Sequence, residues 1–211
     1  MSDVVKFIED NKVLVICRGY YGDDLRKVIT ALHKGGIRMA EVTFDQADPD
    51  AIEKTCGAIR MIREEFPDMK VGSGTVTCVE HVIATKEAGG EFCLSPNVNI
   101  DVIKATKAAG LVSIPGAMTP SEILDAHDAG ADIVKIFPAG WLGLGYLKDV
   151  NHVKFLAAAG VNEENFADFL KAGYSAAGIS GRLLDKKVIA EGNYDELTRR
   201  AQTFVKIASE N

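Results

Sequence analysis

The chain has 211 residues, of which 47% are hydrophobic and 26% are charged, and its formal net charge at pH 7 is −6. This composition is typical of a globular protein, and we expect a single domain over residues 1–211. The acidity and the lack of a basic stripe argue against nucleic acid as a partner, and no apolar run is long enough for a membrane span, so we expect no membrane partner and a cytoplasmic location.

Short apolar runs rich in β-branched residues predict eight strands. They are residues 13–18, 38–44, 70–76, 91–95, 111–115, 132–137, 153–158 and 175–180. Longer amphipathic segments separate them. Strands that alternate with helices predict a parallel sheet, because parallel neighbours need a crossover. Eight such units fit an α/β fold of the (β/α)₈ type, a TIM barrel, with flanking helices at about 2–11 and 194–209.

The helical segments carry signals for their ends. Thr119 is a suitable N-cap, with Pro120 at the first helical position and Glu122 at the third. Asn162 is a candidate N-cap after the seventh strand. Several glycines just before strands are expected to end helices with a left-handed backbone, namely Gly36, Gly90, Gly110, Gly130 and Gly173.

The chain has four widely spaced cysteines, Cys17, Cys56, Cys78 and Cys93. They form no CxxC motif and stand near no histidine cluster, so we expect neither a zinc site nor a disulfide framework. Most of them are expected to be small buried apolar residues. We also expect a set of large side chains to be structural, with Phe44, Phe92, Phe155 and Met118 in the core and Trp141 as a loop anchor.

Lys135 stands in the predicted sixth strand, within the apolar run "GADIVKIFPAG". An ammonium group is costly to bury unless it is paired. One interpretation is that the side chain reaches solvent or pairs with a carboxylate. The other is that burial lowers its pKa and makes it a nucleophile. Catalytic groups of TIM barrels lie at the carboxyl ends of the strands, and the residues alone leave both interpretations open.

Three other polar residues lie near the ends of predicted strands. Glu41 lies in the apolar second strand, where it is either an outward or ion-paired glutamate or a carboxylate that moves protons for a Schiff-base lysine. Arg18 ends the first strand and suits a forked contact with a carboxylate or phosphate, unless it is a surface residue. Thr75 ends the third strand after two glycines, and its hydroxyl can bond a substrate oxygen.

The loops after the seventh and eighth strands of TIM barrels frequently bind phosphate through backbone N–H groups. Here the first of these loops contains Gly160, and the second contains Ser180, Gly181 and Arg182. These residues offer backbone amides, a hydroxyl and a positive charge. We therefore treat both loops as candidates for binding the far end of a substrate.

Seven segments occur in an order and at a spacing that resemble one family of enzymes. They are "CRG", "GGIRMAEVTF", "VGSGTV", "SPNVN", "IPGAMTPSEI", "GADIVKIFPA" and "GVNEENFADFL". Together they resemble the 2-keto-3-deoxy-6-phosphogluconate and 2-keto-3-deoxy-6-phosphogalactonate aldolases over essentially the whole chain. The resemblance implies a class I aldolase, a homotrimer of (β/α)₈ barrels that needs no metal or other cofactor and acts on a small 2-keto acid.

The resemblance also implies a role for each matching residue. Lys135 matches the lysine that forms a Schiff base with the pyruvate-derived ketone, and Glu41 matches the general acid/base. Arg18 and Thr75 match residues around the keto-acid end, and Pro96 lies on a loop that lines the same pocket. An iminium at C2 is an electron sink, so the C3–C4 bond can break to give pyruvate and an aldehyde such as glyceraldehyde 3-phosphate.

The chain departs from the family pattern at three places. Asp45 stands where phosphogluconate aldolases tend to carry an arginine, which leaves Arg18 as the main candidate for the substrate carboxylate. Ala158-Ala159-Gly160 replaces a Thr or Val followed by two glycines, which predicts a crowded phosphate corner without a hydroxyl. Arg182 replaces an acidic residue, and we expect it to contact a phosphate or carboxylate.

Several functions are compatible with these residues. The leading one is cleavage of a 2-keto-3-deoxy (phospho)sugar acid, and an unphosphorylated substrate such as 4-hydroxy-2-oxoglutarate is its alternative. A non-catalytic barrel that binds keto acids or sugar phosphates would have no use for Lys135 together with Glu41. A phosphate-binding isomerase or epimerase would need no lysine on the sixth strand. Fold analogy does not separate them, since this barrel hosts many chemistries.

Overall fold

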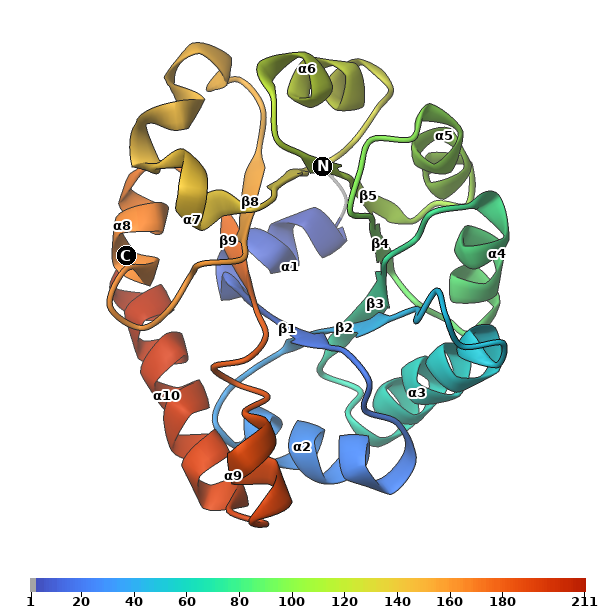
Figure 1. Cartoon of the computed structure of the whole chain (residues 1–211), viewed down its shortest axis with the longest axis vertical. Coiled ribbons are helices and arrows are strands. Elements are labelled where there is room, and N and C mark those ends of the chain that lie inside the picture. The colour runs from blue at the N-terminus through green and yellow to red at the C-terminus, as the bar shows by residue number, and fades with distance from the viewer. Residues whose placement is uncertain (1–2) are drawn as a thin grey trace.

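The computed structural model describes residues 3–211. Figure 1 shows a ring of strands surrounded by helices, and the order of the parallel strands is β5-β4-β3-β2-β1-β9-β8-β7-β6. The strands are β1 (Val13–Cys17), β2 (Met39–Thr43), β3 (Lys70–Gly74), β4 (Phe92–Leu94), β5 (Val112–Ile114), β6 (Gly116–Ala117), β7 (Val134–Ile136), β8 (Phe155–Ala158) and β9 (Ala176–Ile179). All eight predicted strands are present, and the TIM-barrel prediction is confirmed.

Pro115 divides the fifth predicted strand into β5 and β6. Proline has no N–H to donate, so it interrupts the ladder. β5 pairs with β4, and β6 pairs with β7. The Pro115 carbonyl accepts from the Lys135 amide at 2.8 Å, and the Ser113 carbonyl accepts from the Asp132 amide at 3.0 Å. Hydrogen bonds therefore run from the β5–β6 segment to the β7 segment and close the ring.

Helices cover the outside of the ring (Figure 1). They are α1 (Asp3–Asn11), α2 (Gly22–Lys34), α3 (Ala51–Glu65), α4 (Val79–Glu87), α5 (Ile100–Ala108), α6 (Pro120–Asp128), α7 (Ala139–Leu142), the 3₁₀ helix η1 (Leu144–Val150), α8 (Phe166–Lys171), α9 (Lys186–Ala190) and α10 (Tyr194–Glu210). The expected flanking helices are α1 and α10, and residue 2 lies outside the described part. Within residues 3–211, no helix combines the length and apolarity that a membrane crossing requires.

The strand residues alternate between two apolar clusters. On β1, Val13 and Val15 belong to the core between strands and helices, whereas Leu14 belongs to the cluster inside the ring. The inner cluster also contains Val5 and Ile8 of α1. Figure 1 shows α1 behind the ring of strands. This helix closes the end of the barrel where the strands begin, which leaves the opposite end open for a site.

The expected start of α6 is confirmed. The Thr119 side chain accepts from the Glu122 amide, the Glu122 side chain accepts from the Thr119 amide, and Pro120 occupies the first turn. Four of the five glycines expected at helix ends have positive φ, and the prediction for Gly90 is wrong. Gly89 takes the left-handed conformation instead, at φ +83°, because the C-cap of α4 is Ala88 and Gly89 follows it directly.

The prediction that Asn162 caps a helix is also wrong. Helix α8 begins at Phe166, and its N-cap position is Asn165. The Asn162 side chain instead accepts from the amides of Glu164 and Asn165, at 2.9 and 3.2 Å. Asn162 therefore stabilises the turn that precedes the helix.

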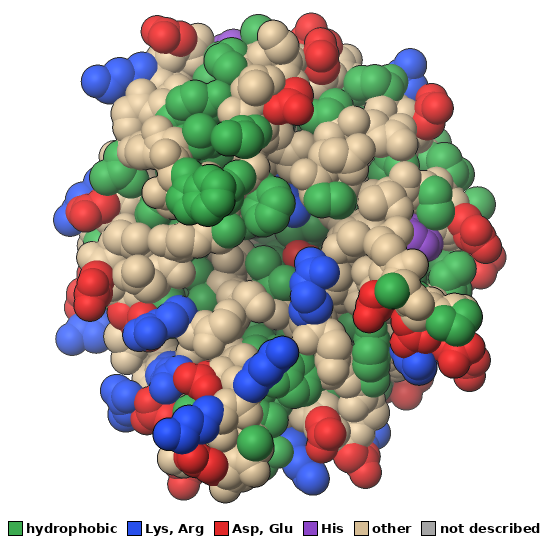
Figure 2. All heavy atoms as spheres, viewed as in Figure 1, with side chains coloured by type: hydrophobic (Ala, Val, Ile, Leu, Met, Phe, Trp, Pro, Cys, Tyr) green, Lys and Arg blue, Asp and Glu red, His purple; other side chains and the backbone are tan. Residues whose placement is uncertain are grey.

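Phe44, Phe92 and Phe155 are buried as expected, but two of the structural predictions are wrong. Met118 is exposed, and Trp141 is 84% exposed and anchors no loop. After β7 the chain forms the four-residue α7 and then η1, so no long helix is present there to cover the indole. Figure 2 shows apolar side chains gathered on the surface beside the mouth of the barrel.

Candidate active site

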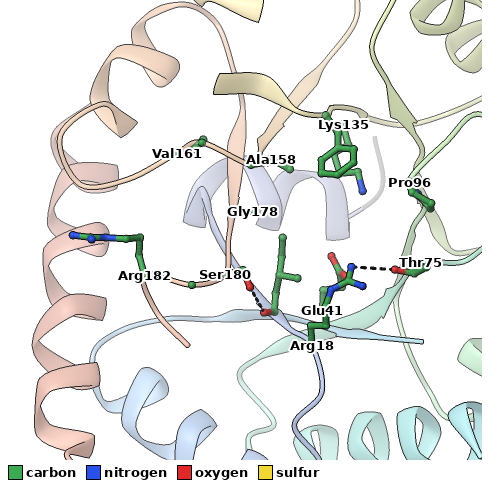
Figure 3. A pocket seen from close by; sticks show the side chains of 15 residues that line it. Arg18, Glu41, Thr75, Pro96, Lys135, Ala158, Val161, Gly178, Ser180 and Arg182 are labelled. Carbon is green, nitrogen blue, oxygen red and sulfur yellow. Dashed lines mark hydrogen bonds between the residues drawn. The ribbon is translucent and has the colours of Figure 1, made fainter. Parts of the chain in front are cut away.

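A cavity of about 660 Å³ opens at the carboxyl ends of the strands. All nine residues expected in the site line it, although the strands that carry them are far apart in the sequence. They are Arg18, Glu41, Thr75, Pro96, Lys135, Gly160, Ser180, Gly181 and Arg182. Figure 3 shows Lys135, Glu41 and Arg18 pointing toward one another across the opening, with Pro96 and Thr75 on one side.

Lys135 projects into this cavity from β7. It is 9% exposed, and its register neighbours are Gly116 on β6 and Leu156 on β8. Burial lowers the pKa of Lys135, the Glu41 carboxylate opposes that shift, and Arg18 adds to it. Among residues 3–211, no carboxylate lies within ion-pair distance of the amine, so the interpretation of Lys135 as a paired structural lysine is not supported.

An aromatic ring flanks the amine. The Lys135 Nζ atom lies 5.1 Å from the centroid of the Phe137 ring, and Phe137 also lines the cavity. The two side chains are two residues apart on one segment, so they share a face of the barrel. A cation over the face of an aromatic ring is attracted by it, so this contact favours the charged amine and works against the effect of burial.

Glu41 lies opposite Lys135 on β2 and is 3% exposed. Its Oε1 atom accepts a hydrogen bond from the Thr43 hydroxyl at 3.0 Å. Burial raises the pKa of Glu41, while the charges of Lys135 and Arg18 and the bond from Thr43 oppose that rise. A carboxyl group with a raised pKa gives and takes a proton at a higher pH than an ordinary glutamate, which suits a general acid/base.

The position of Glu41 depends on a glycine of the neighbouring strand. Gly74 on β3 has no side chain, and a Cβ there would overlap the Oε1 and Cδ atoms of Glu41. The "GSGTV" segment therefore has a steric reason for its second glycine. Its first glycine, Gly72, leaves room in the same way for Phe92 of β4.

Arg18 and Thr75 lie at the mouth, on the loops after β1 and β3, the two neighbours of β2. The Arg18 Nη2 atom donates to the Thr75 hydroxyl at 3.4 Å, as Figure 3 shows. Thr75 has φ +56°, a conformation that few residues other than glycine adopt. The Gln46 side chain donates to the Thr75 carbonyl at 3.2 Å and so ties this strained residue to the loop after β2.

The loops after β8 and β9 form the opposite corner of the cavity. Gly160 has φ +88° and lies against Gly140 so closely that neither position has room for a Cβ. The Ser180 hydroxyl donates to the Ile16 carbonyl at 3.3 Å. Among the described residues, no acceptor takes the amide N–H groups of Gly160, Val161, Gly181 and Arg182. Four donors without an internal partner at one corner suit an anionic group.

Arg182 lines the cavity but does not point into its centre. Its Nε atom donates to the Glu163 carboxylate at 2.8 Å, and Figure 3 shows its guanidinium directed away from Lys135 and Glu41. Asp45, the other departure from the family pattern, is outside the cavity lining, and its carboxylate accepts from the Ala47 amide at 3.0 Å. Asp45 therefore supplies no contact for a substrate carboxylate.

Ala158 and Ala159 line the cavity beside Gly160, as the predicted phosphate corner requires, and four further residues that line it were not expected there: Ile16, Phe137, Val161 and Gly178. Strand alternation is the signal that could have identified some of them. Ile16 and Gly178 have the inward parity of Leu14 and Ala176, and Phe137 follows Lys135 by two residues. Ala159 has φ +64°, which no sequence pattern indicates for an alanine.

The cysteines take no part in this cavity. Cys17, Cys56 and Cys93 are buried and Cys78 is partly buried, with none in a disulfide. Burial raises the pKa of Cys93 to about 11, so its thiol stays neutral near pH 7. Over residues 3–211, no three or more His, Cys, Asp or Glu side chains are grouped so that they could hold a metal ion.

Comparisons with known proteins agree with this geometry. The family model for KDPG and KHG aldolases matches residues 4–200. The chain is 33% identical to the KHG/KDPG aldolase of Escherichia coli strain K12 over 83% of this chain and 82% of that one. It is 26% identical to the 2-dehydro-3-deoxy-phosphogluconate aldolase of Haemophilus influenzae, over 98% and 97% of the two chains.

Solved structures give the same result. A native KDPGal structure aligns with a TM-score of 0.82 at 27% identity, over 94% of each chain. A KDPG aldolase from Legionella pneumophila, with pyruvate captured as a covalent carbinolamine intermediate, aligns with a TM-score of 0.83 at 25% identity, over 95% of this chain and 97% of that one.

Proposed function

The chain belongs to the KDPG and KHG aldolase family, and we propose from this premise that it is a class I aldolase acting on a 2-keto-3-deoxy (phospho)sugar acid. The products are pyruvate and an aldehyde such as glyceraldehyde 3-phosphate. The observation that carries this proposal is the buried amine of Lys135, which has no ion-pair partner among the described residues and faces the buried carboxyl of Glu41. Family membership does not favour the alternative of a non-catalytic binding barrel.

Lys135 supplies the nucleophile. Its neutral amine adds to the C2 carbonyl of the substrate to give a carbinolamine, and loss of water gives an iminium. The lowered pKa of Lys135 keeps more of the amine neutral than in water. The iminium then accepts the electron pair of the C3–C4 bond as that bond breaks.

Glu41 handles the protons of the same steps. Its carboxylate takes the proton of the C4 hydroxyl as the C3–C4 bond breaks, and the aldehyde leaves. The enamine that remains takes a proton at C3 from the Glu41 carboxyl, which restores the carboxylate. Water then hydrolyses the pyruvate iminium and frees Lys135. The raised pKa of Glu41 helps its protonated form give a proton after its carboxylate has taken one.

Arg18 and Thr75 bind the keto-acid end in this proposal. The guanidinium of Arg18 lies at the mouth, and among residues 3–211 its one hydrogen bond is the 3.4 Å bond to Thr75, so a carboxylate can replace that contact. The amides of Gly160 and Gly181, with Ser180 beside them, receive the far end of the substrate. Pro96 forms part of the wall on the side of Thr75.

Oligomeric state and location are further parts of the proposal. We propose a homotrimer in the cytoplasm, in line with the family resemblance and with the absence of a membrane-crossing helix among residues 3–211. Sedimentation equilibrium tests the assembly, since a monomer or dimer at micromolar concentration would contradict it.

Borohydride trapping tests the reaction itself. The protein is incubated with pyruvate and sodium borohydride, and intact mass and peptide mapping locate any reduced adduct. We expect one adduct, on Lys135, that is absent from Lys135→Ala. A folded protein that forms no adduct would contradict the class I mechanism.

A further inference from the structure

The side chain of Thr43 is closely associated with the carboxyl group of Glu41. Both residues belong to β2, two positions apart, so their side chains share the inner face of the barrel. The Thr43 Oγ1 atom donates to Glu41 Oε1 at 3.0 Å, and Thr43 is 1% exposed. A hydrogen bond to an ionised acceptor in such a buried place is one of the stronger kinds.

Thr43 itself is outside the lining of the cavity. Its backbone carbonyl accepts from the Tyr21 hydroxyl at 3.3 Å, which fixes the end of β2 from the side of α2. The hydroxyl of Thr43 thus acts on Glu41 from a place that a substrate in the cavity does not occupy. Any effect of Thr43 on the reaction passes through Glu41.

Gly74 bounds the same carboxyl group from the neighbouring strand. Thr43 and Gly74 are register partners between β2 and β3, and a Cβ on Gly74 would overlap Glu41 Oε1. The oxygen that accepts from Thr43 is therefore also the oxygen packed against the Gly74 backbone. One side chain donor and one missing side chain together select a single orientation of the carboxyl group.

We infer that Thr43 is a positioning residue for the aldol cleavage, because its hydroxyl holds Glu41 Oε1 against Gly74 and so keeps the carboxyl group turned toward Lys135. The inference rests on the proposed class I function. Its direct prediction is that loss of the hydroxyl lowers kcat with little change in KM.

The groups that face Glu41 set the pH dependence. Lys135 on β7 and Arg18 after β1 are the facing cations, and Cys17 on β1 is a neighbouring thiol that burial keeps protonated. Burial raises the pKa of Glu41 and the Thr43 bond opposes that rise. Removal of the hydroxyl therefore raises the pKa of Glu41 further, and the acidic limb of the kcat profile moves to higher pH.

The test compares Thr43→Val, Thr43→Ala and Thr43→Ser. Valine keeps the shape of the threonine side chain but lacks the hydroxyl donor. Alanine lacks both, and serine keeps the hydroxyl. We expect kcat to fall by about tenfold or more in Val and Ala, KM to stay within about twofold, and Ser to retain most of the activity. The acidic limb should move up in Val and Ala and stay in place in Ser.

A second measurement does not depend on turnover. Carbon-13 labelling of glutamate carboxyl groups, with Glu41→Gln to assign the signal, reports the titration of Glu41 in each folded variant. A Glu41 titration and an acidic limb that are the same in Val, Ala and Ser would overturn the inference. If Thr43→Val does not fold, the comparison of Thr43→Ala with Thr43→Ser decides. Both variants lack the methyl group of threonine, and only Thr43→Ser keeps the hydroxyl.

Pyruvate trapping of the unmodified protein separates this inference from the proposed function. If Lys135 forms the adduct and the Thr43 variants keep the kinetics and the Glu41 titration of the unmodified protein, the role of Thr43 is overturned and the aldolase proposal stands. No adduct overturns the aldolase proposal and, with it, the role of Thr43 as a positioning residue for the cleavage. The carboxyl titration then still decides whether the Thr43 hydroxyl lowers the pKa of Glu41.

Discussion

Lys135 on β7 and Glu41 on β2 face each other across the open end of the barrel, each buried and neither in an ion pair within the described chain. Burial lowers the pKa of the amine and raises the pKa of the carboxyl group. Both shifts favour the neutral forms, so the pair is less costly to bury and can exchange protons. The same burial makes each residue a cost to stability, which gives predictions separate from catalysis.

Replacement of Lys135 by methionine is expected to stabilise the fold near neutral pH. The pKa of Lys135 is lowered from its ordinary value of 10.5, so between the folded pKa and 10.5 the unfolded chain binds more protons than the folded one. Stability of the unmodified protein therefore rises with pH through that window. Lys135→Met should raise the free energy of unfolding by about 1 kcal/mol at pH 7, with a smaller gain toward pH 10.5.

Urea unfolding at several pH values measures this gain, and Lys104→Met on the exposed side of α5 is the matched control. A gain that grows with pH, or an equal gain in the control, would contradict the assigned cause.

Replacement of Glu41 by glutamine is expected to separate activity from stability. The pKa of Glu41 is raised above 4.5, so the folded chain binds more protons than the unfolded one between 4.5 and the folded pKa. Stability of the unmodified protein falls as pH rises through that window. Glu41→Gln should lose activity by about 10²- to 10⁴-fold. Its stability relative to the unmodified protein should increase with pH.

Steady-state kinetics and chemical unfolding from pH 4 to pH 8 test Glu41→Gln together. Asp45→Asn is the matched control, because that carboxylate follows the same strand and lies outside the cavity. Equal effects of the two variants would argue against a special role of Glu41.

Gly74→Ala is expected to displace the Glu41 carboxyl group. The added Cβ would overlap its Oε1 atom, so activity should fall by at least about a hundredfold and stability by roughly 2 kcal/mol. Gly57→Ala is the control, since a Cβ there meets nothing within 4 Å inside α3. It should leave activity unchanged and stabilise the helix by about 0.5 kcal/mol. Near-normal activity of Gly74→Ala would show that Glu41 tolerates another position.

The ion pair between Arg182 and Glu163 is expected to affect phosphorylated substrates alone. Arg182→Ala should raise KM for a phosphorylated substrate by about three- to tenfold, because it removes a cation that can bind the phosphate. Glu163→Gln should lower this KM by about threefold, because it frees Arg182 from an ion pair that contributes little to stability. The KM of an unphosphorylated 2-keto acid should stay the same in both. If Arg182→Ala leaves both KM values unchanged, Arg182 makes no contact with the phosphate.

Ala159→Gly is expected to relieve backbone strain at the same corner. Ala159 has φ +64°, and the left-handed conformation costs an L residue about 1–2 kcal/mol. After the extra chain entropy of glycine, the gain in stability should be about 0.5 kcal/mol. Ala158→Gly, in the buried end of β8, should instead destabilise by about 1 kcal/mol. Thermal unfolding of the two variants side by side checks the opposite signs.

The sequence by itself determined the barrel and pointed to Lys135 and Glu41 as candidate site residues. Its eight apolar strand runs, separated by capped helices, specify the elements, since strand alternation and capping depend on neighbours in the chain. Lys135 and Glu41 stood out as candidates because a charged residue in an apolar strand is costly to bury, while their roles were implied by the family resemblance. The bond between Thr43 and Glu41 is local as well, because residues two apart on a strand share a face.

The tertiary structure alone decided which distant groups meet. The fit of Gly74 against Glu41 depends on the register of β2 with β3. The pairing of Arg182 with Glu163 depends on whether the guanidinium points to this carboxylate or into the cavity. The exposure of Trp141 depends on the short α7 and η1 that follow β7 and leave the indole uncovered. Such outcomes balance several weak contacts between separate elements, and no spacing along the chain encodes that balance.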